Sequence, residues 1–91
     1  MLTVDLTADP LKIIGEVDMS SAPLLIEAVL LSRSPGIDLS GITFMDSTGL
    51  HALIDLVKAR PSLRIVAVSE PVRRLIRMAG LAELLGLDID A

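Results

Sequence analysis

Ile37-Asp-Leu-Ser-Gly-Ile-Thr-Phe-Met-Asp46-Ser47-Thr48-Gly49-Leu50 is the stretch of the sequence that decides the fold. Its apolar residues predict a buried strand, and the polar residues after them predict a tight turn that opens a helix. The turn presents the Ser47 and Thr48 hydroxyls beside the Asp46 carboxylate, and Gly49 gives close backbone access. A hydroxyl at the start of a helix lies among free N–H groups and at the positive end of the helix dipole. We therefore expect a phosphate carried on Ser47 to be stabilised there.

The same turn has a simpler interpretation, in which Ser47 or Thr48 is only the N-cap of the helix. Ser and Thr are common at that position because their side-chain oxygen accepts a hydrogen bond from a backbone N–H of the first turn. The pair alone favours the cap, so the choice depends on the rest of the sequence.

Predicted strands and helices alternate on both sides of this stretch. Apolar–polar alternation and β-branched runs indicate strands, whereas apolar residues at i, i+3, i+4 and i+7, as at Leu50, Leu53, Ile54 and Val57, indicate helices. The expected strands are Leu2–Leu6, Leu11–Val17, a short one at about Gly36–Leu39 with Ser40-Gly41 after it, Leu63–Val68 and Leu87–Ile89. The expected helices are residues 20–32, the Ser47 turn to Pro61, a helix capped by Ser69 that ends at Gly80, and a short one at Ala82–Leu85.

Two strands joined through Ala8-Asp9-Pro10, followed by alternating helices and strands, predict an α/β fold: a small mixed sheet with helices packed mostly on one face. A chain of 91 residues has room for one core, so a single domain over residues 1–91 is expected. Because Phe44 is the only aromatic residue, that core should consist of aliphatic side chains and Met. The Ser47 turn should lie at the carboxyl edge of the sheet, where functional groups of such folds collect.

The composition excludes several classes of function. Absence of cysteine excludes a disulfide scaffold, a thiolate metal site and thiol catalysis, and it agrees with a cytoplasmic location. A net charge of −4 opposes nucleic-acid binding, and we interpret the basic stripe at Arg73, Arg74 and Arg77 as the solvated face of a helix. The apolar run Ala22–Leu31 is too short to cross a bilayer and no secretory signal is visible, so membrane insertion is not expected.

Two arrangements that suggest catalysis or nucleotide binding lack required parts. Gly36 to Thr43 has the glycine spacing of a P-loop, but Ile42 stands where the lysine is required. Ser47 and His51, the only histidine, are four residues apart on one helical face, yet no G-x-S-x-G elbow surrounds Ser47. We therefore expect no enzyme activity and a His51 that faces solvent or a partner.

Three carboxylates are expected near the hydroxyl turn. Glu16, Asp18 and Asp46 precede predicted helices or end predicted strands at the same edge of the sheet. A metal site would need convergent oxygen ligands, usually more of them, so no metal is expected. Local roles also fit, because Asp46 starts the turn before its helix and Asp18 belongs to the cap of the first helix.

Three segments resemble, in the same order, the STAS domain family, specifically the bacterial anti-sigma-factor antagonists. Asp46-Ser-Thr-Gly-Leu50 after an Asp-Leu-Ser-x-x-x-Phe-Met strand resembles the family signature. Ile13-Ile-Gly-Glu-Val-Asp18 resembles the Gly-Glu-x-Asp turn that follows the second strand of the family. Val66–Leu81 resembles the final strand–helix unit with its Gly-Leu exit, so the resemblance covers about Leu2 to Leu87.

The resemblance implies a binding module that is controlled by phosphorylation and needs no cofactor. It implies that the unmodified form binds an anti-sigma factor that is also a serine kinase, which frees a sigma factor. The kinase would use ATP to phosphorylate Ser47, and a phosphatase would reverse the modification. His51 departs from the family, in which this position is commonly Gly. The implied partner surface consists of Glu16, Asp18, Asp46, Ser47, Thr48, Gly49 and His51.

Two other functions remain open from the sequence. The first is a constitutive STAS subunit that binds the ATPase of a bacterial phospholipid-transport ABC system, because such subunits have a comparable Asp-x-x-Gly-Leu turn. The second is a regulatory domain of an anion transporter, which the absence of a membrane segment disfavours.

Overall fold

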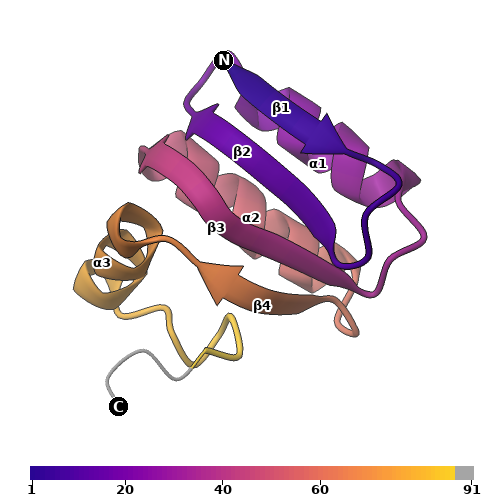
Figure 1. Ribbon diagram of the computed structural model, residues 1–91. Helices are drawn as coiled ribbons and strands as arrows, with labels where there is room; N and C mark the ends of the chain where they lie inside the picture. The colour runs from indigo at the N-terminus through magenta and orange to yellow at the C-terminus, as the bar shows by residue number, and fades with distance from the viewer. Residues whose placement is uncertain (88–91) are drawn as a thin grey trace.

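The computed structural model describes residues 1–87, which form a four-stranded mixed sheet with three helices (Figure 1). The elements are β1 (Leu2–Asp5), β2 (Leu11–Val17), α1 (Ala22–Leu31), β3 (Gly36–Met45), α2 (Ser47–Ala59), β4 (Arg64–Val68) and α3 (Glu70–Ala79). The strand order is β1-β2-β3-β4, with β1 antiparallel to β2 and the other neighbours parallel. The predicted α/β fold class with a mixed sheet is confirmed.

The sheet has one face covered by helices and one open face. In Figure 1, α1 and α2 lie behind the sheet, and α3 lies beside the carboxyl end of β4. Alternate residues of β2 follow this division: Leu11 and Ile13 are fully buried, whereas Lys12 and Ile14 are exposed. A period of two is the pattern of a strand that is buried on one side only.

The core is aliphatic, as the composition predicts. Its largest fully buried side chains are Leu11, Ile13, Leu25, Ile37, Leu39, Ile42, Leu53, Leu56, Ile76, Val17, Val29 and Val72. The predicted apolar face of α2 is confirmed at Leu50 and Leu53, which are buried, while Ile54 and Val57 pack against its border. The only aromatic side chain, Phe44, stays outside this core and is 48% exposed.

The strand β3 is longer than predicted. It continues for ten residues to Met45 instead of ending near Leu39, so Ser40 and Gly41 lie within it. Gly41 pairs with Ile14 just beyond a register shift in β2, and a Cβ on Gly41 would stand 2.9 Å from Ile14 Cγ1. The irregularity and the missing side chain let the two strands stay paired where the sequence suggested an interruption.

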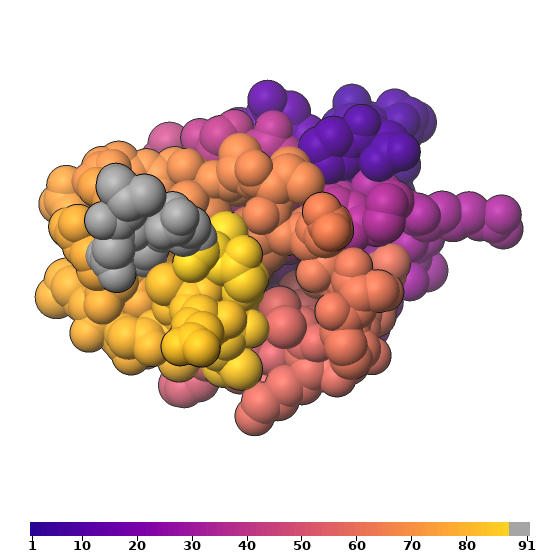
Figure 2. Space-filling model, turned by 90° about the horizontal axis from the view of Figure 1, so that it is seen from below, coloured from indigo at the N-terminus to yellow at the C-terminus, as the bar shows by residue number. Residues whose placement is uncertain are grey.

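The last elements of the sequence prediction are wrong or lie outside the described residues. Ala82–Leu85 forms turns, not a helix, because Gly80 and Gly86 adopt a left-handed φ of 70° on either side of a segment too short to sustain a helix. Figure 2 shows this segment in yellow beside β4, where Leu85 is buried. Of the predicted strand Leu87–Ile89, Leu87 is in no strand and residues 88–89 lie outside the described part.

The amino-terminal edge of the parallel strands is held by polar contacts that are buried or partly buried. Ser34 Oγ donates a hydrogen bond to Asp9 Oδ1 at 2.6 Å and accepts one from Gly36 N at 3.2 Å. The Arg60 guanidinium, at the end of α2, donates to Val29 O at 2.7 Å and to Ser34 O at 3.3 Å. These bonds tie the loops of that edge together and leave the opposite, carboxyl edge to the Ser47 turn.

In residues 1–87, no helix has the length and apolar character needed to cross a bilayer.

Candidate functional site

The carboxyl ends of β2 and β3 bring two loops side by side. Val17 pairs with Met45 in the parallel ladder, so Asp18 and Asp46 each begin a loop at the same edge of the sheet. Asp46 N also donates a hydrogen bond to Val17 O at 3.2 Å, which ties the loops together. The prediction that the Ser47 turn lies at the carboxyl edge, on the left of the sheet in Figure 1, is confirmed.

Asp46 is the N-cap of α2. Its extended backbone precedes the helix, its Oδ1 accepts a hydrogen bond from Gly49 N at 3.1 Å, and its carbonyl accepts one from Leu50 N at 3.0 Å. The simpler interpretation that Ser47 or Thr48 caps the helix is therefore wrong. An aspartate caps as well as a serine does, so the hydroxyls of Ser47 and Thr48 are not needed to cap the helix.

The Ser47 hydroxyl is free and exposed at the first position of α2. Thr48 follows it and is only partly exposed. Neither hydroxyl makes a hydrogen bond to another residue in the range 1–87, and the backbone N–H groups of both residues are likewise unpaired in that range. A group attached to Ser47 Oγ would therefore reach solvent beside two free donors at the positive end of a helix.

Gly49 is buried and sets how closely α2 approaches the sheet. A Cβ at this position would stand 2.7 Å from Met45 Cγ and 2.8 Å from Val17 Cγ1. The sequence suggested that Gly49 gives access to the backbone, but its observed contacts are with the core. Gly49 thus holds the hydroxyl turn against the ends of β2 and β3.

Asp18 organises the neighbouring loop before α1. Its Oδ1 accepts hydrogen bonds from Ser20 Oγ at 2.7 Å, Ser20 N at 2.9 Å and Ser21 N at 3.1 Å. The Ser20 hydroxyl and, next, the Ser21 N–H hold the pKa of the Asp18 carboxyl below its usual range. The Asp18 carboxylate thus closes the turn before the first helix, whereas the N-cap position itself is Ser21, which makes no side-chain cap hydrogen bond.

Ser20 and Ser21 are residues of this loop that sequence reasoning missed as parts of the site. Ser21 Oγ donates to Glu16 O at 2.8 Å and accepts from Asp18 N at 2.9 Å, so it joins the end of β2 to the start of α1. The available signal was an Asp followed two and three residues later by Ser, a spacing typical of turns that an Asp side chain closes.

Glu16 binds the amino terminus of the chain. It is exposed, and its Oε1 accepts a hydrogen bond from the N-terminal ammonium of Met1 at 2.7 Å. Each of the three predicted carboxylates thus has its own local partner. Among residues 1–87, no three Asp, Glu, His or Cys side chains gather closely enough to hold a metal ion.

His51 lies one helical turn after Ser47 and is exposed, as the sequence predicts for a solvent-facing residue. No hydrogen bond joins it to Ser47 in the described part of the chain. Asp55 and Lys58 continue this exposed face of the helix. We name the four exposed residues of the face the α2 stripe: Ser47, His51, Asp55 and Lys58. The stripe presents a free hydroxyl, an imidazole and two opposite charges on the exposed side of the helix.

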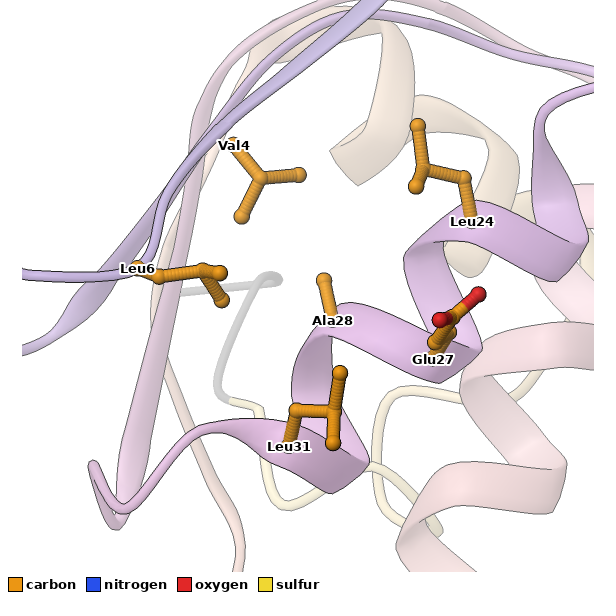
Figure 3. Close-up of a pocket in the computed structure, with 6 residues that line it drawn as sticks. All are labelled: Val4, Leu6, Leu24, Glu27, Ala28 and Leu31. Atoms are coloured by element: carbon orange, nitrogen blue, oxygen red, sulfur yellow. The ribbon is translucent and has the colours of Figure 1, made fainter.

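A separate groove lies between β1 and α1 (Figure 3). It measures about 280 Å³ and is lined by Val4, Leu6, Leu24, Glu27, Ala28 and Leu31. In Figure 3 the aliphatic side chains surround the groove and Glu27 contributes its one charge. With no hydroxyl or cation in its lining, the groove does not share the chemistry of the Ser47 turn.

Comparison of the sequence with known proteins identifies one protein family and relatives that share one name. The STAS domain model matches residues 6–90. A protein of Staphylococcus epidermidis named "Anti-sigma-B factor antagonist" is 34% identical over 83 residues, covering 81% of this chain and 77% of its own length. A protein of the same name from Staphylococcus aureus (strain NCTC 8325 / PS 47) is 32% identical over the same coverage.

A solved structure has the same fold. The crystal structure of an anti-sigma factor antagonist from Mycobacterium paratuberculosis superposes with a TM-score of 0.76 and 29% sequence identity, covering 96% of this chain and 85% of the other. The match of the STAS domain model to residues 6–90, together with the shared fold, confirms the family that the sequence resembles. The chain belongs to the STAS domain family.

Proposed function

We propose that this protein is a phosphorylation-controlled antagonist of an anti-sigma factor. Its unmodified form binds an anti-sigma factor that is also a serine kinase, and this binding frees a sigma factor. The proposal depends above all on the Ser47 hydroxyl, which Asp46 leaves free and exposed at the start of α2. The relatives named anti-sigma-B factor antagonists support the same role. The protein itself catalyses no reaction.

Ser47 is the proposed phosphoacceptor, ahead of Thr48. The bound kinase transfers the γ-phosphoryl group of ATP to Ser47 Oγ and releases ADP, and a phosphatase removes it by hydrolysis. Ser47 is exposed, whereas Thr48 is partly covered, so the Ser47 oxygen is the easier one for a kinase to reach.

The proposed partner surface surrounds that oxygen. Its members share the carboxyl edge of β2 and β3 or the first turns of α2: Glu16, Asp18, Asp46, Ser47, Thr48, Gly49 and His51. Exposed Ser47 and His51 contact the partner directly, and buried Gly49 contributes by fixing the position of the turn. The groove between β1 and α1 is not part of this surface.

Phosphorylation switches binding off by charge. A phosphate adds roughly −1.5 to −2 units of charge near pH 7, at an edge that already carries Asp18 and Asp46. An interface fitted to a neutral serine then meets like-charge repulsion and the cost of burying the phosphate. The helix N-terminus favours a negative group, so the fold itself should change little.

Mass spectrometry after incubation with the cognate kinase and ATP tests the acceptor. Wild type and Thr48→Ala should each gain one phosphate on the peptide that contains Ser47, and Ser47→Ala should gain none. Phosphate on Thr48 alone, or incorporation that persists in Ser47→Ala, would show that the assignment is wrong.

Binding measurements with the anti-sigma kinase test the switch. Ser47→Asp should bind at least about ten-fold more weakly than wild type, or about 1.4 kcal/mol, and high salt should restore part of the loss. Ser47→Asn, which has a similar size and no charge, is the matched control and should bind more tightly than Ser47→Asp. Equal affinity of Ser47→Ala and Ser47→Asp would reject the switch and favour the constitutive subunit of a phospholipid-transport ABC system.

A further inference from the structure

Ser47 and His51 are neighbours on the exposed surface of α2. Residues four apart in a helix have Cβ atoms roughly 5–6 Å from each other, close enough for their side chains to meet. Both side chains are exposed, and neither has a hydrogen-bond partner among residues 1–87. A group added to Ser47 Oγ would therefore lie within reach of an imidazole that has no hydrogen bond to break within residues 1–87.

His51 is the nearest residue along α2 that can supply positive charge to Ser47. Lys58, the only other cation of the helix before its end, is eleven residues beyond Ser47, or about 16 Å along the axis. Two acidic groups lie near the turn: Asp46 caps the helix, and Asp18 begins the adjacent loop. The N-terminal ammonium of Met1 lies at the same edge and is paired with Glu16. Within α2, a phosphate on Ser47 would thus find its nearest cation in protonated His51.

The other charged residues to consider around His51 belong to α2 itself and to the two elements that pack against it, α1 and β3. Asp55 lies one turn further along α2 and is the acidic neighbour of the imidazole on the stripe. The helix α1 packs against α2, and its one charged residue, Glu27, lines the groove against β1. The one charged residue of β3, Asp38, has its carboxylate 3.8 Å from Lys12 Nζ.

We propose that His51 is the charge partner of phosphorylated Ser47: its protonated imidazole donates an N–H hydrogen bond to a phosphate oxygen across one turn of α2. This inference rests on the proposed phosphorylation of Ser47. It assigns His51 the regulation of the switch in addition to a contact with the anti-sigma kinase. A protonated His51 cancels part of the added charge, so the repulsion that disfavours rebinding depends on its protonation.

The sign of the pH effect follows from linkage. A neighbouring dianion favours the charged imidazole and raises the pKa of His51, and the imidazolium in turn lowers the second pKa of the phosphate. Above the raised His51 pKa the phosphate is unpaired and repels the partner most; below it the ion pair forms and the repulsion falls.

NMR titration of the untagged protein tests the inference, because His51 is the only histidine and gives a single set of imidazole signals. Phosphoserine is installed at position 47 during translation by stop-codon suppression, so no kinase is required. The His51 midpoint should rise by about 0.15–0.4 pH unit relative to the Ser47 protein, the size expected of an exposed i,i+4 ion pair. Ser47→Asp should give a smaller rise and Ser47→Asn none, and inorganic phosphate added to the Ser47 protein should not reproduce the effect.

A ³¹P titration of the phosphoserine provides the reciprocal measurement. His51→Gln, at an exposed position, should raise the second phosphate midpoint because it removes the cation. Asp55→Asn is the matched control, because it changes the other neighbour of His51. The difference in the His51 midpoint between the Ser47 and phosphoserine proteins should remain in this variant.

A His51 midpoint that rises by less than about 0.15 unit on phosphorylation, or a phosphate midpoint that His51→Gln leaves unchanged, would overturn the inference. Both measurements are independent of the kinase. Failure of the kinase to modify Ser47 would instead overturn the proposed function and leave the charge pairing as measured.

Discussion

Gly49 lies directly against Val17 where α2 begins. A methyl group added at position 49 would stand 2.8 Å from Val17 Cγ1, closer than Cβ atoms normally come to a neighbour, and 3.1 Å from Val17 O, which is a tight contact. Backbone atoms at the end of β2 cannot move aside without disturbing the ladder to β3. The contact therefore fixes the start of the helix, and with it Ser47, relative to the sheet.

Gly49→Ala should destabilise the protein by about 1–3 kcal/mol, because the new methyl group overpacks the junction between α2 and the sheet. Urea unfolding followed by circular dichroism measures the change. Thr48→Ala, one residue earlier and partly exposed, is the control and should stay within about 0.5 kcal/mol of wild type. A Gly49→Ala protein as stable as wild type would contradict the packing role.

Asp46→Ala should cost about 0.5–2 kcal/mol of stability, because it removes the acceptor for Gly49 N at the helix cap. Asp46→Asn keeps a cap of similar quality and removes only the charge, so its stability should stay close to wild type. Comparison of the two variants in kinase binding separates the charge of Asp46 from its structural role. Equal destabilisation by Ala and Asn would show that the cap is not the source of the loss.

Leu53→Ala should lower stability by about 2–5 kcal/mol, since the Leu53 side chain is fully buried under α2. His51→Ala, two residues earlier on the exposed stripe, should leave the midpoint of thermal unfolding nearly unchanged and weaken binding of the anti-sigma kinase. The reverse pattern, with His51→Ala unfolding the domain, would require a new assignment of the two faces of α2.

Stability should fall in acid partly through Asp18. Hydrogen bonds from Ser20 and Ser21 lower the folded-state pKa of Asp18 below the ordinary value of 3.8. Its contribution is therefore complete above that ordinary value and is lost as pH falls through the lower folded-state pKa. Asp18→Asn should show a shallower loss of the free energy of unfolding between pH 6 and pH 2.5.

Ser20→Ala is the companion variant for Asp18. It removes the hydroxyl that contributes most to the lowered pKa and should reproduce part of the shallower slope. Unfolding curves collected in urea at each pH provide the measurement. An Asp18→Asn protein with the same acid dependence as wild type would show that this carboxylate is not coupled to folding.

The sequence was sufficient where a local pattern sets the structure. The helical spacing of Leu50 and Leu53 and the alternation in Leu11–Val17 identified buried faces correctly, because burial of apolar side chains fixes those periods. The carboxyl-edge position of Ser47 followed from the alternation of helices and strands.

Where contacts between distant residues decide the structure, the sequence was insufficient. Ser40-Gly41 looks like an interruption, and only its pairing with Ile14 across a register shift keeps β3 continuous. Gly49 looks like an open backbone position until Val17 and Met45 are placed beside it. Ser69 occupies the cap position of α3, but its hydroxyl makes no cap hydrogen bond, so a residue type in the expected place did not guarantee the interaction.

The candidate site also contains residues that the sequence placed correctly and one assignment that it made wrongly. Ser47 and His51 were placed correctly on one exposed face, because their spacing of four residues is a local property of a helix. The residue that caps α2 was assigned wrongly in the simpler interpretation, since Asp46, Ser47 and Thr48 are all good caps and only the backbone shows which one is used.

The α2 stripe and the residues that anchor its helix share no member. Val17, Asp46 and Gly49 hold the start of α2, whereas Ser47, His51, Asp55 and Lys58 face outward. After a gene duplication, two copies can therefore diverge at the outward positions while their common anchors stay unchanged. Related signalling pathways in one cell can be insulated from each other in this way, with few substitutions and without loss of a folded protein.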